Sequence, residues 1–235
     1  MWSLKNLKAV LLIALTIIVL QSFTTPLLPK VYVVGDSISI HYGPYLKTSL
    51  EGFFSYDRKR DKGEAVKDLD HPVGANGGDS GMVLTYLKEL KTNTDFKTDY
   101  LLVNCGLHDI KRNSPNDSTQ ISLKKYKDNL QSIITISEDM KVKLVWVSST
   151  PVVDSIHNKR VPFFRFEKDL IAYNKAADSI MQRAHVPIID LFTFTKKITP
   201  DAYLDHIHYK KEIREKQADF IAGSLSAIFN CNKEG

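Results

Sequence analysis

The 235-residue sequence has only two cysteines, Cys105 and Cys231. Two cysteines are too few for the disulfide framework that stabilises many small secreted domains. Cys105 ends an apolar run and is expected to be buried, whereas Cys231 lies in the C-terminal tail, which favours two unpaired thiols over a bridge. The length suits one domain with a sizeable hydrophobic core, and nothing in the composition suggests disorder or a fibre.

The sequence also offers no clear membrane-spanning run. The apolar stretch from Ala9 to Leu20 is shorter than the roughly 20 residues that a spanning helix needs. It follows Lys5 and Lys8 and ends at a polar pair, which is the order of a secretory signal. No Ala-x-Ala cleavage site is visible, so an uncleaved anchor is the alternative. We expect residues 1–22 to be a signal peptide or N-terminal anchor, residues 23–235 to form a single domain, and the protein to be exported to the periplasm, the medium or the cell surface.

Charge of one sign is not concentrated anywhere in the chain. The formal net charge is +5, and it falls to +3 without Lys5 and Lys8, because residues 1–22 contain no acidic residue. The basic residues are scattered or alternate with acids, as in residues 57–61. This pattern is typical of a solvated surface and argues against a nucleic-acid partner.

The hydrophobic pattern predicts an α/β fold. Short apolar runs predict buried strands, and runs with helical spacing predict helices between them. The expected strands are 31–34, a short one near 71–73, 100–104, 142–147 and 186–190, and the expected helices are 38–50, 81–91, 122–138, 166–184 and 211–229, with 51–70 as a loop. This alternation predicts a doubly wound, mostly parallel five-stranded sheet with helices on both faces.

Three turns should meet at one edge of that sheet. In doubly wound sheets the active site forms at the carboxyl ends of the strands. Ser37 and the turns 104–109 and 148–151 each follow a predicted strand. We therefore expect them to lie together at the functional edge.

Ser37 is a candidate nucleophile. It follows a β-branched and aromatic strand within Gly35-Asp36-Ser37, where a rigid sheet would hold it toward solvent. A serine hydroxyl needs a base, and that base needs a third group to orient it. Asp205 and His208 are three residues apart, so one turn can present the carboxylate to the imidazole.

Four ordered blocks resemble the GDSL, or SGNH, hydrolase superfamily. Gly35-Asp36-Ser37 and Asp205-x-x-His208 match its first and last blocks, and the segment 76–81, Asn-Gly-Gly-Asp-Ser-Gly, matches its second. The resemblance covers residues 30–229 and implies a flavodoxin-like fold and a cofactor-free serine hydrolase. It implies Ser37 as nucleophile, His208 as general base and Asp205 as its orienter. It also implies that the backbone N–H of Gly78, beside that of Ser37, stabilises the oxyanion.

The third block departs from the family pattern. The turn reads Gly-Leu-His108-Asp, with His108 where the superfamily usually has the asparagine that donates to the oxyanion. A neutral imidazole carries one N–H and can replace that donor, although a titratable group would make the role depend on pH. A packed or surface histidine without this role is the alternative.

Two other chemistries compete with a serine hydrolase at these residues. Gly78-Asp79-Ser80-Gly81 resembles the nucleophile motif of chymotrypsin-like proteases, but those are β-barrels whose serine follows its histidine, so Ser80 is interpreted as a helix cap. His206 and His208 beside Asp205, joined by His108-Asp109 if the fold brings that turn close, would suit a divalent metal, but no cysteine or glutamate completes a known motif. We therefore predict no metal.

The predicted activity is hydrolysis of an ester on a small molecule or glycan, with a short acyl group such as acetyl on a carbohydrate implied by the family and by export. Transfer of the acyl group to a sugar, or a non-catalytic binding domain, are the alternatives. Aromatic and basic residues in 53–56 and 157–165 would suit sugar stacking or carboxylate binding, or they pack back onto the domain. No long hydrophobic lid is evident, and the oligomeric state is open.

Overall fold

The computed structural model describes residues 27–198 and 202–234. The expected signal peptide or anchor therefore lies outside the described residues. Within those residues, no helix is both long and apolar enough to cross a membrane.

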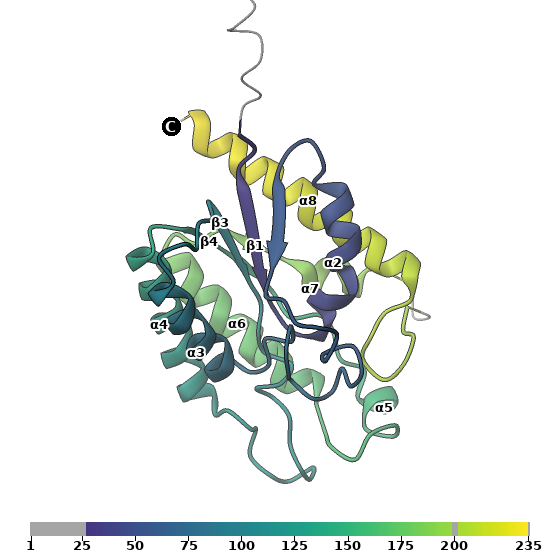
Figure 1. Ribbon diagram of the computed structural model, residues 1–235. Helices are drawn as coiled ribbons and strands as arrows, with labels where there is room; N and C mark the ends of the chain where they lie inside the picture. Colours follow the sequence, from purple (N-terminus) through teal and green to yellow (C-terminus); the bar gives the residue numbers. More distant parts are fainter. Residues whose placement is uncertain (1–26, 199–201, 235) are drawn as a thin grey trace, which may run out of the picture.

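Five parallel strands form a single sheet in the order β2-β1-β3-β4-β5 (Figure 1). The strands are β1 (Lys30–Val34), β2 (Ser55–Arg58), β3 (Tyr100–Val103), β4 (Lys143–Val147) and β5 (Ile188–Ile189). Their carboxyl ends are level, because Val34 pairs with Val103 and Val103 with Trp146. The turns after β1, β3 and β4 consequently share one edge of the sheet, as the sequence predicted.

The helices cover both faces of this sheet. They are α2 (Ser37–Ser49), α3 (Ser80–Thr92), α4 (Leu123–Asp139), α5 (Asp154–His157), α6 (Glu167–Arg183), α7 (Leu191–Lys196) and α8 (Lys211–Glu234). Helices α3, α4 and α6 pack together on one face, and α2, α7 and α8 on the other (Figure 1). The predicted doubly wound α/β fold is thereby confirmed.

The core lies between the sheet and these helices. The residues of β1, β3 and β4 are almost all buried on both faces, as expected for central strands of a parallel sheet. Leu130 of α4 and Leu46 of α2 press on opposite faces and are fully buried. Cys105 is buried in this core, whereas Cys231 is exposed, and both are free thiols, as predicted.

One strand was predicted in the wrong place. The strand expected near 71–73 is a loop, where Pro72 has no N–H to donate and Val73 is 41% exposed. The actual edge strand, β2, lies inside the segment expected to be a loop. Its sequence, Ser-Tyr-Asp-Arg, is polar because an edge strand buries little of its surface, so it gives no apolar run to read. The short helices α5 and α7 were also not predicted.

Candidate active site

The turn after β1 presents Ser37 at the start of α2. Asp36 caps this helix by accepting a hydrogen bond from the N–H of Ile38 at 2.9 Å. Gly35 leaves no room for a side chain, since a Cβ there would lie 2.9 Å from the Cβ of Ser39. This close approach lets the helix begin immediately after the strand, which places the Ser37 hydroxyl at the carboxyl edge of the sheet.

Ser37, His208 and Asp205 form a hydrogen-bonded chain. His208 Nε2 lies 2.8 Å from Ser37 Oγ, and His208 Nδ1 lies 2.8 Å from Asp205 Oδ2. The other oxygen of Asp205 accepts the backbone N–H groups of Ile207 and His208, at 2.9 and 2.7 Å. The carboxylate is thus fixed by its own loop and can hold the imidazole in the tautomer that accepts a proton from Ser37.

Asp205 is built to stay ionised. Burial opposes its charge, but the hydrogen bonds from the His208 ring and from the two backbone N–H groups outweigh burial and hold its pKa well below the usual range. A carboxylate that stays negative can stabilise the imidazolium that forms when His208 takes a proton.

The loop with Gly78 packs directly against the Ser37 turn. The N–H of Gly77 donates to the carbonyl of Gly35 at 2.8 Å. Gly78 has a φ of +70°, and a Cβ there would meet the sulfur of Met82 at 2.5 Å, so only glycine fits. The N–H of Gly78, expected as an oxyanion donor, donates to the side chain of Asn76 at 3.0 Å. This N–H is therefore held within its loop in the structure.

His108 is a buried, neutral histidine at the same edge. Only 3% of its surface is exposed, and its ring makes no hydrogen bond to any described residue. Burial, reinforced by the positive charges of Arg165 and Lys111, lowers its pKa to about 3. At neutral pH the ring consequently carries one N–H and no charge, so a loss of donor function by titration is not expected near pH 7.

Asp109, next to His108, is the main hydrogen-bond partner of Ser80. The Ser80 hydroxyl and N–H both donate to the Asp109 carboxylate, and Asn129 donates to the hydroxyl at 2.9 Å. Burial raises the pKa of Asp109 to about 7 despite these bonds. Ser80 was predicted to cap α3, but Asp79 is the cap, accepting from the N–H of Met82. Ser80 is instead the buried first residue of the helix. Its hydroxyl bonds Asp109 and Asn129 rather than a histidine, and it ties α3 to the 106–109 turn.

A pair of histidines, His206 and His157, lies beside His208. His206 Nε2 is 3.0 Å from Asp70 Oδ2, and His206 Nδ1 is 3.0 Å from His157 Nδ1. Burial lowers the pKa of His157 to about 3. The His41 ring, on α2, lies 4.8 Å from the His208 ring. Sequence reasoning placed His206 as a neighbour of the site but missed the roles of Asp70, His157 and His41, because nothing in their local sequence indicates long-range contacts.

The residues considered for a metal do come together. One ligand atom from each of Asp205, His206 and His208 can be chosen so that all lie within 4.8 Å of one another. However, both ring nitrogens of His208 and both of His206 already have protein partners. This arrangement suits a proton-transferring histidine better than a metal ligand.

Of the two segments considered as cleft linings, only one reaches this edge. Phe54 is buried against Tyr100 and Phe229, near the amino ends of the strands, so 53–56 does not line the site. The 157–165 segment does approach it through His157 and Arg165. Phe163 is also buried, with its ring packed against those of His157 and His206, so it offers no open face for a sugar.

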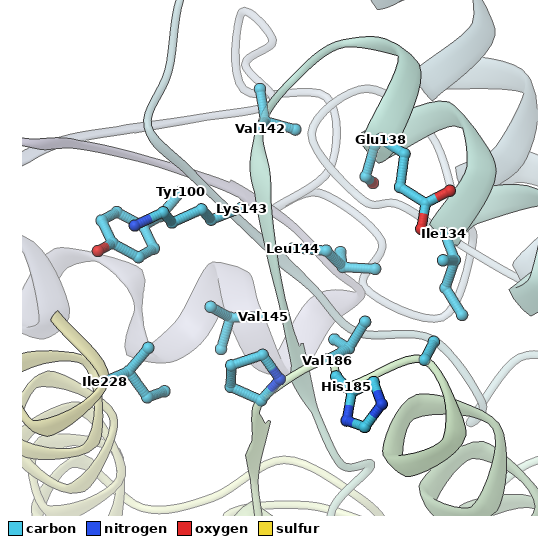
Figure 2. Close-up of a pocket in the computed structure, with 13 residues that line it drawn as sticks. Tyr100, Ile134, Glu138, Val142, Lys143, Leu144, Val145, His185, Val186 and Ile228 are labelled. Carbon is cyan, nitrogen blue, oxygen red and sulfur yellow. The ribbon is translucent and has the colours of Figure 1, made fainter. Parts of the chain in front are cut away.

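A pocket of about 250 Å³ lies at the opposite edge of the sheet (Figure 2). It is lined by Tyr100 and Lys143, the first residues of β3 and β4, together with His185 and Ile228. Its labelled side chains are mostly aliphatic (Figure 2), and none of Ser37, Asp205 and His208 lines it. The pocket is therefore separate from the triad.

The comparison with family models decides the classification. The model of the GDSL-like lipase/acylhydrolase family matches residues 33–213, which contain Ser37, Gly78, His108, Asp205 and His208. The chain belongs to this family. No curated protein matches the sequence.

Solved structures share the fold at low identity. A GDSL-like lipase from Bacteroides thetaiotaomicron is 12% identical with a TM-score of 0.60, covering 86% of this chain and 88% of that one. An acetyl xylan esterase is 15% identical with a TM-score of 0.60, covering 83% and 99%. The esterase EstA from Pseudoalteromonas sp., in a structure inhibited by monoethylphosphonate, is 13% identical with a TM-score of 0.58, covering 86% and 98%. At identities this low, the comparison with solved structures shows only that this chain shares their fold.

Proposed function

We propose that this member of the GDSL-like lipase/acylhydrolase family is a serine esterase with Ser37 as its nucleophile. The observation that carries the proposal is the pair of 2.8 Å contacts that joins Ser37, His208 and Asp205. Family membership implies an ester substrate. The same pair of contacts favours catalysis over a non-catalytic binding domain.

The reaction follows from this geometry. His208 Nε2 takes the proton as Ser37 Oγ attacks the ester carbonyl, and a tetrahedral intermediate forms. His208 then returns the proton to the leaving alcohol as the C–O bond breaks, leaving an acyl-enzyme. Water, activated by the same imidazole, attacks the acyl group and releases the acid and free Ser37. Asp205 holds the ring and stabilises its charged form throughout.

Three donors are proposed for the oxyanion. The Ser37 N–H has no partner among the described backbone and side-chain groups, so it is free to donate. The neutral His108 ring supplies a second N–H, in the place of the family's usual asparagine. The Gly78 N–H would supply a third if it exchanges its bond to Asn76 for the oxyanion when substrate binds.

We further propose a short acyl group, such as acetyl, on a carbohydrate, and export of the protein. The acyl proposal is supported by the absence of a long hydrophobic lid in the sequence and by an acetyl xylan esterase among the distant fold neighbours. Export is supported by the order of charge and apolar residues at the N-terminus. Transfer of the acyl group to a sugar would use the same acyl-enzyme, so the acceptor must be determined by experiment.

The test follows hydrolysis of p-nitrophenyl acetate by the wild-type protein and by Ser37→Ala and His208→Ala, with and without a sugar alcohol as acceptor. We expect each variant to lose at least about a thousandfold in kcat while remaining folded. Free acetate as the main product with acceptor present supports a hydrolase, and acetylated acceptor supports a transferase. Activity that survives in folded Ser37→Ala would refute the proposed nucleophile.

A further inference from the structure

Arg165 is a buried cation with no ion-pair partner among the residues that the structure describes. Only 2% of its surface is exposed, although an arginine side chain is seldom fully buried unless it is paired. Its Nε donates to the carbonyl of Leu107 at 2.7 Å, and its guanidinium carbon lies 4.9 Å from the Phe163 ring centroid. Its two terminal amino groups have no hydrogen-bond partner, and it forms no ion pair, among the residues that the structure describes.

This arrangement is unfavourable for a protein with no ligand. Removing a charged group from water is costly unless it is paired, and one carbonyl and one aromatic ring replace only part of the lost hydration. Burial lowers the pKa of Arg165 to about 10, so it remains charged at neutral pH. Arg112 is different. Its backbone is hydrogen-bonded to Phe164 of the same segment, and its guanidinium forms an ion pair with Asp169 at 2.7 Å.

The guanidinium of Arg165 lies near the catalytic edge, close enough to His108 to lower the pKa of that ring. Leu107, which holds its Nε, immediately precedes His108, and Asn158 next to His157 accepts the Arg165 backbone N–H at 3.0 Å. Two acids, Asp70 and Asp36, are near enough to interact with it electrostatically, but neither forms an ion pair or a hydrogen bond with it. Asp36 caps α2 through Oδ1, while its buried Oδ2 has no partner among the described residues, and Asp70 binds His206 through Oδ2. The positive charge therefore has no directly bonded acidic partner in the described part of the chain.

We infer that the ester substrate carries a carboxylate close to the scissile bond, and that Arg165 binds it through its two terminal amino groups. These two groups present parallel N–H donors, a geometry that matches the two oxygens of a carboxylate. The inference rests on the proposed esterase function and refines its substrate class to esters with an acidic group. That group belongs either to the acyl part, as in a dicarboxylic half-ester, or to the alcohol part, as in an acidic sugar.

A structural role for Arg165 is the competing explanation. Its bond to Leu107 would then serve only to hold the 106–109 turn, with its charge balanced at a distance. Under that explanation, replacing Arg165 would weaken the hydrolysis of charged and neutral esters equally. Under ours, it would remove the preference for charged esters and leave the neutral ones much less affected.

The experiment compares matched esters in two arms. In the acyl arm, mono-p-nitrophenyl succinate is compared with p-nitrophenyl butyrate, and in the alcohol arm 4-acetoxybenzoate is compared with 4-acetoxybenzamide. The proteins are wild type, Arg165→Gln, Arg165→Lys and Arg160→Gln. Arg160 is the matched control because it is an exposed arginine of the same segment, so its replacement changes the net charge equally.

We expect wild type and Arg160→Gln to favour the carboxylate ester in one arm by about tenfold or more in kcat/KM, a ratio that one charge-assisted contact can supply. Arg165→Gln should lose this preference, and Arg165→Lys should retain only part of it. The arm in which the preference appears identifies which part of the substrate carries the acid. Equal losses on charged and neutral esters in Arg165→Gln would overturn the inference.

The wild-type protein alone can test the inference if no Arg165 variant folds. A preference of the wild type for the neutral ester in both arms would also overturn it. Hydrolysis of the neutral esters reports the proposed esterase function separately. If no ester is hydrolysed, that function fails, and thermal unfolding of the wild-type protein with 4-acetoxybenzoate or its amide then tests the carboxylate site directly. Stabilisation by the carboxylate alone supports the site, and equal or no stabilisation by both compounds refutes it.

Discussion

Replacing His108 with alanine would test the least conventional part of this active site. The ring is 97% buried and makes no hydrogen bond to a described residue, and burial lowers its pKa to about 3. At pH 7 it therefore offers one neutral N–H in a setting with little competing water. Removing one oxyanion donor from an enzyme of this kind lowers kcat by about 10²- to 10³-fold, or roughly 2.7–4 kcal/mol.

The assay measures kcat for p-nitrophenyl acetate between pH 5 and 9, together with thermal unfolding. His108→Ala should lose about a hundredfold or more at every pH, because the wild-type ring does not titrate in this range. His108→Asn should recover most of the loss, since asparagine restores a neutral N–H donor. His71→Ala, which removes an exposed histidine, is the control and should leave kcat unchanged. A folded His108→Ala within threefold of wild type, or a His108→Asn no better than alanine, would refute the donor role.

Three further predictions concern the neighbouring groups. Asp205→Asn should lower kcat by about 10⁴-fold near neutral pH, measured with the same ester, because the His208 ring loses the acceptor that fixes its tautomer; a loss below tenfold would contradict this. Gly78→Ala should lower both the unfolding temperature and kcat, because its φ of +70° strains any side chain and the new Cβ would lie 2.5 Å from the Met82 sulfur; an unchanged unfolding temperature would show that the loop relaxes freely. Burial lowers the pKa of His157 in the folded protein from its ordinary value of about 6.5 to about 3, so between these pH values the unfolded chain binds the extra proton and stability falls as pH falls. In denaturant titrations from pH 6.5 to 4, His157→Gln should therefore reduce this slope by up to about 1.4 kcal/mol per pH unit, and an unchanged slope would contradict the pKa assignment.

The sequence predicted the parts of the fold that have strong local signals. The strands that became β1, β3 and β4 are continuous apolar runs because both of their faces are buried. The edge strand β2 is polar and half-exposed, so a search for apolar runs misses it and predicts a strand near 71–73 instead. Level strand ends then explain why Ser37 and the turns after β3 and β4 were predicted at one edge without any long-range information.

The site was predictable only where a local motif carried it. Ser37, Asp205 and His208 lie in short blocks, and the structure brings them together over a separation of 171 residues. Three other features depend on how loops pack against one another: the bond between Gly78 and Asn76, the Asp70–His206–His157 chain, and the burial of Arg165. A sequence shows that these residues are present, but not which atoms they reach.

The most direct test of the central claim is to identify the serine that reacts. The purified protein is treated with a fluorophosphonate probe, digested, and its modified peptide sequenced by mass spectrometry. We predict one adduct, on Ser37, which disappears in Ser37→Ala and is much slower to form in His208→Ala. An adduct on Ser80, or no adduct on a folded wild-type protein, would contradict it.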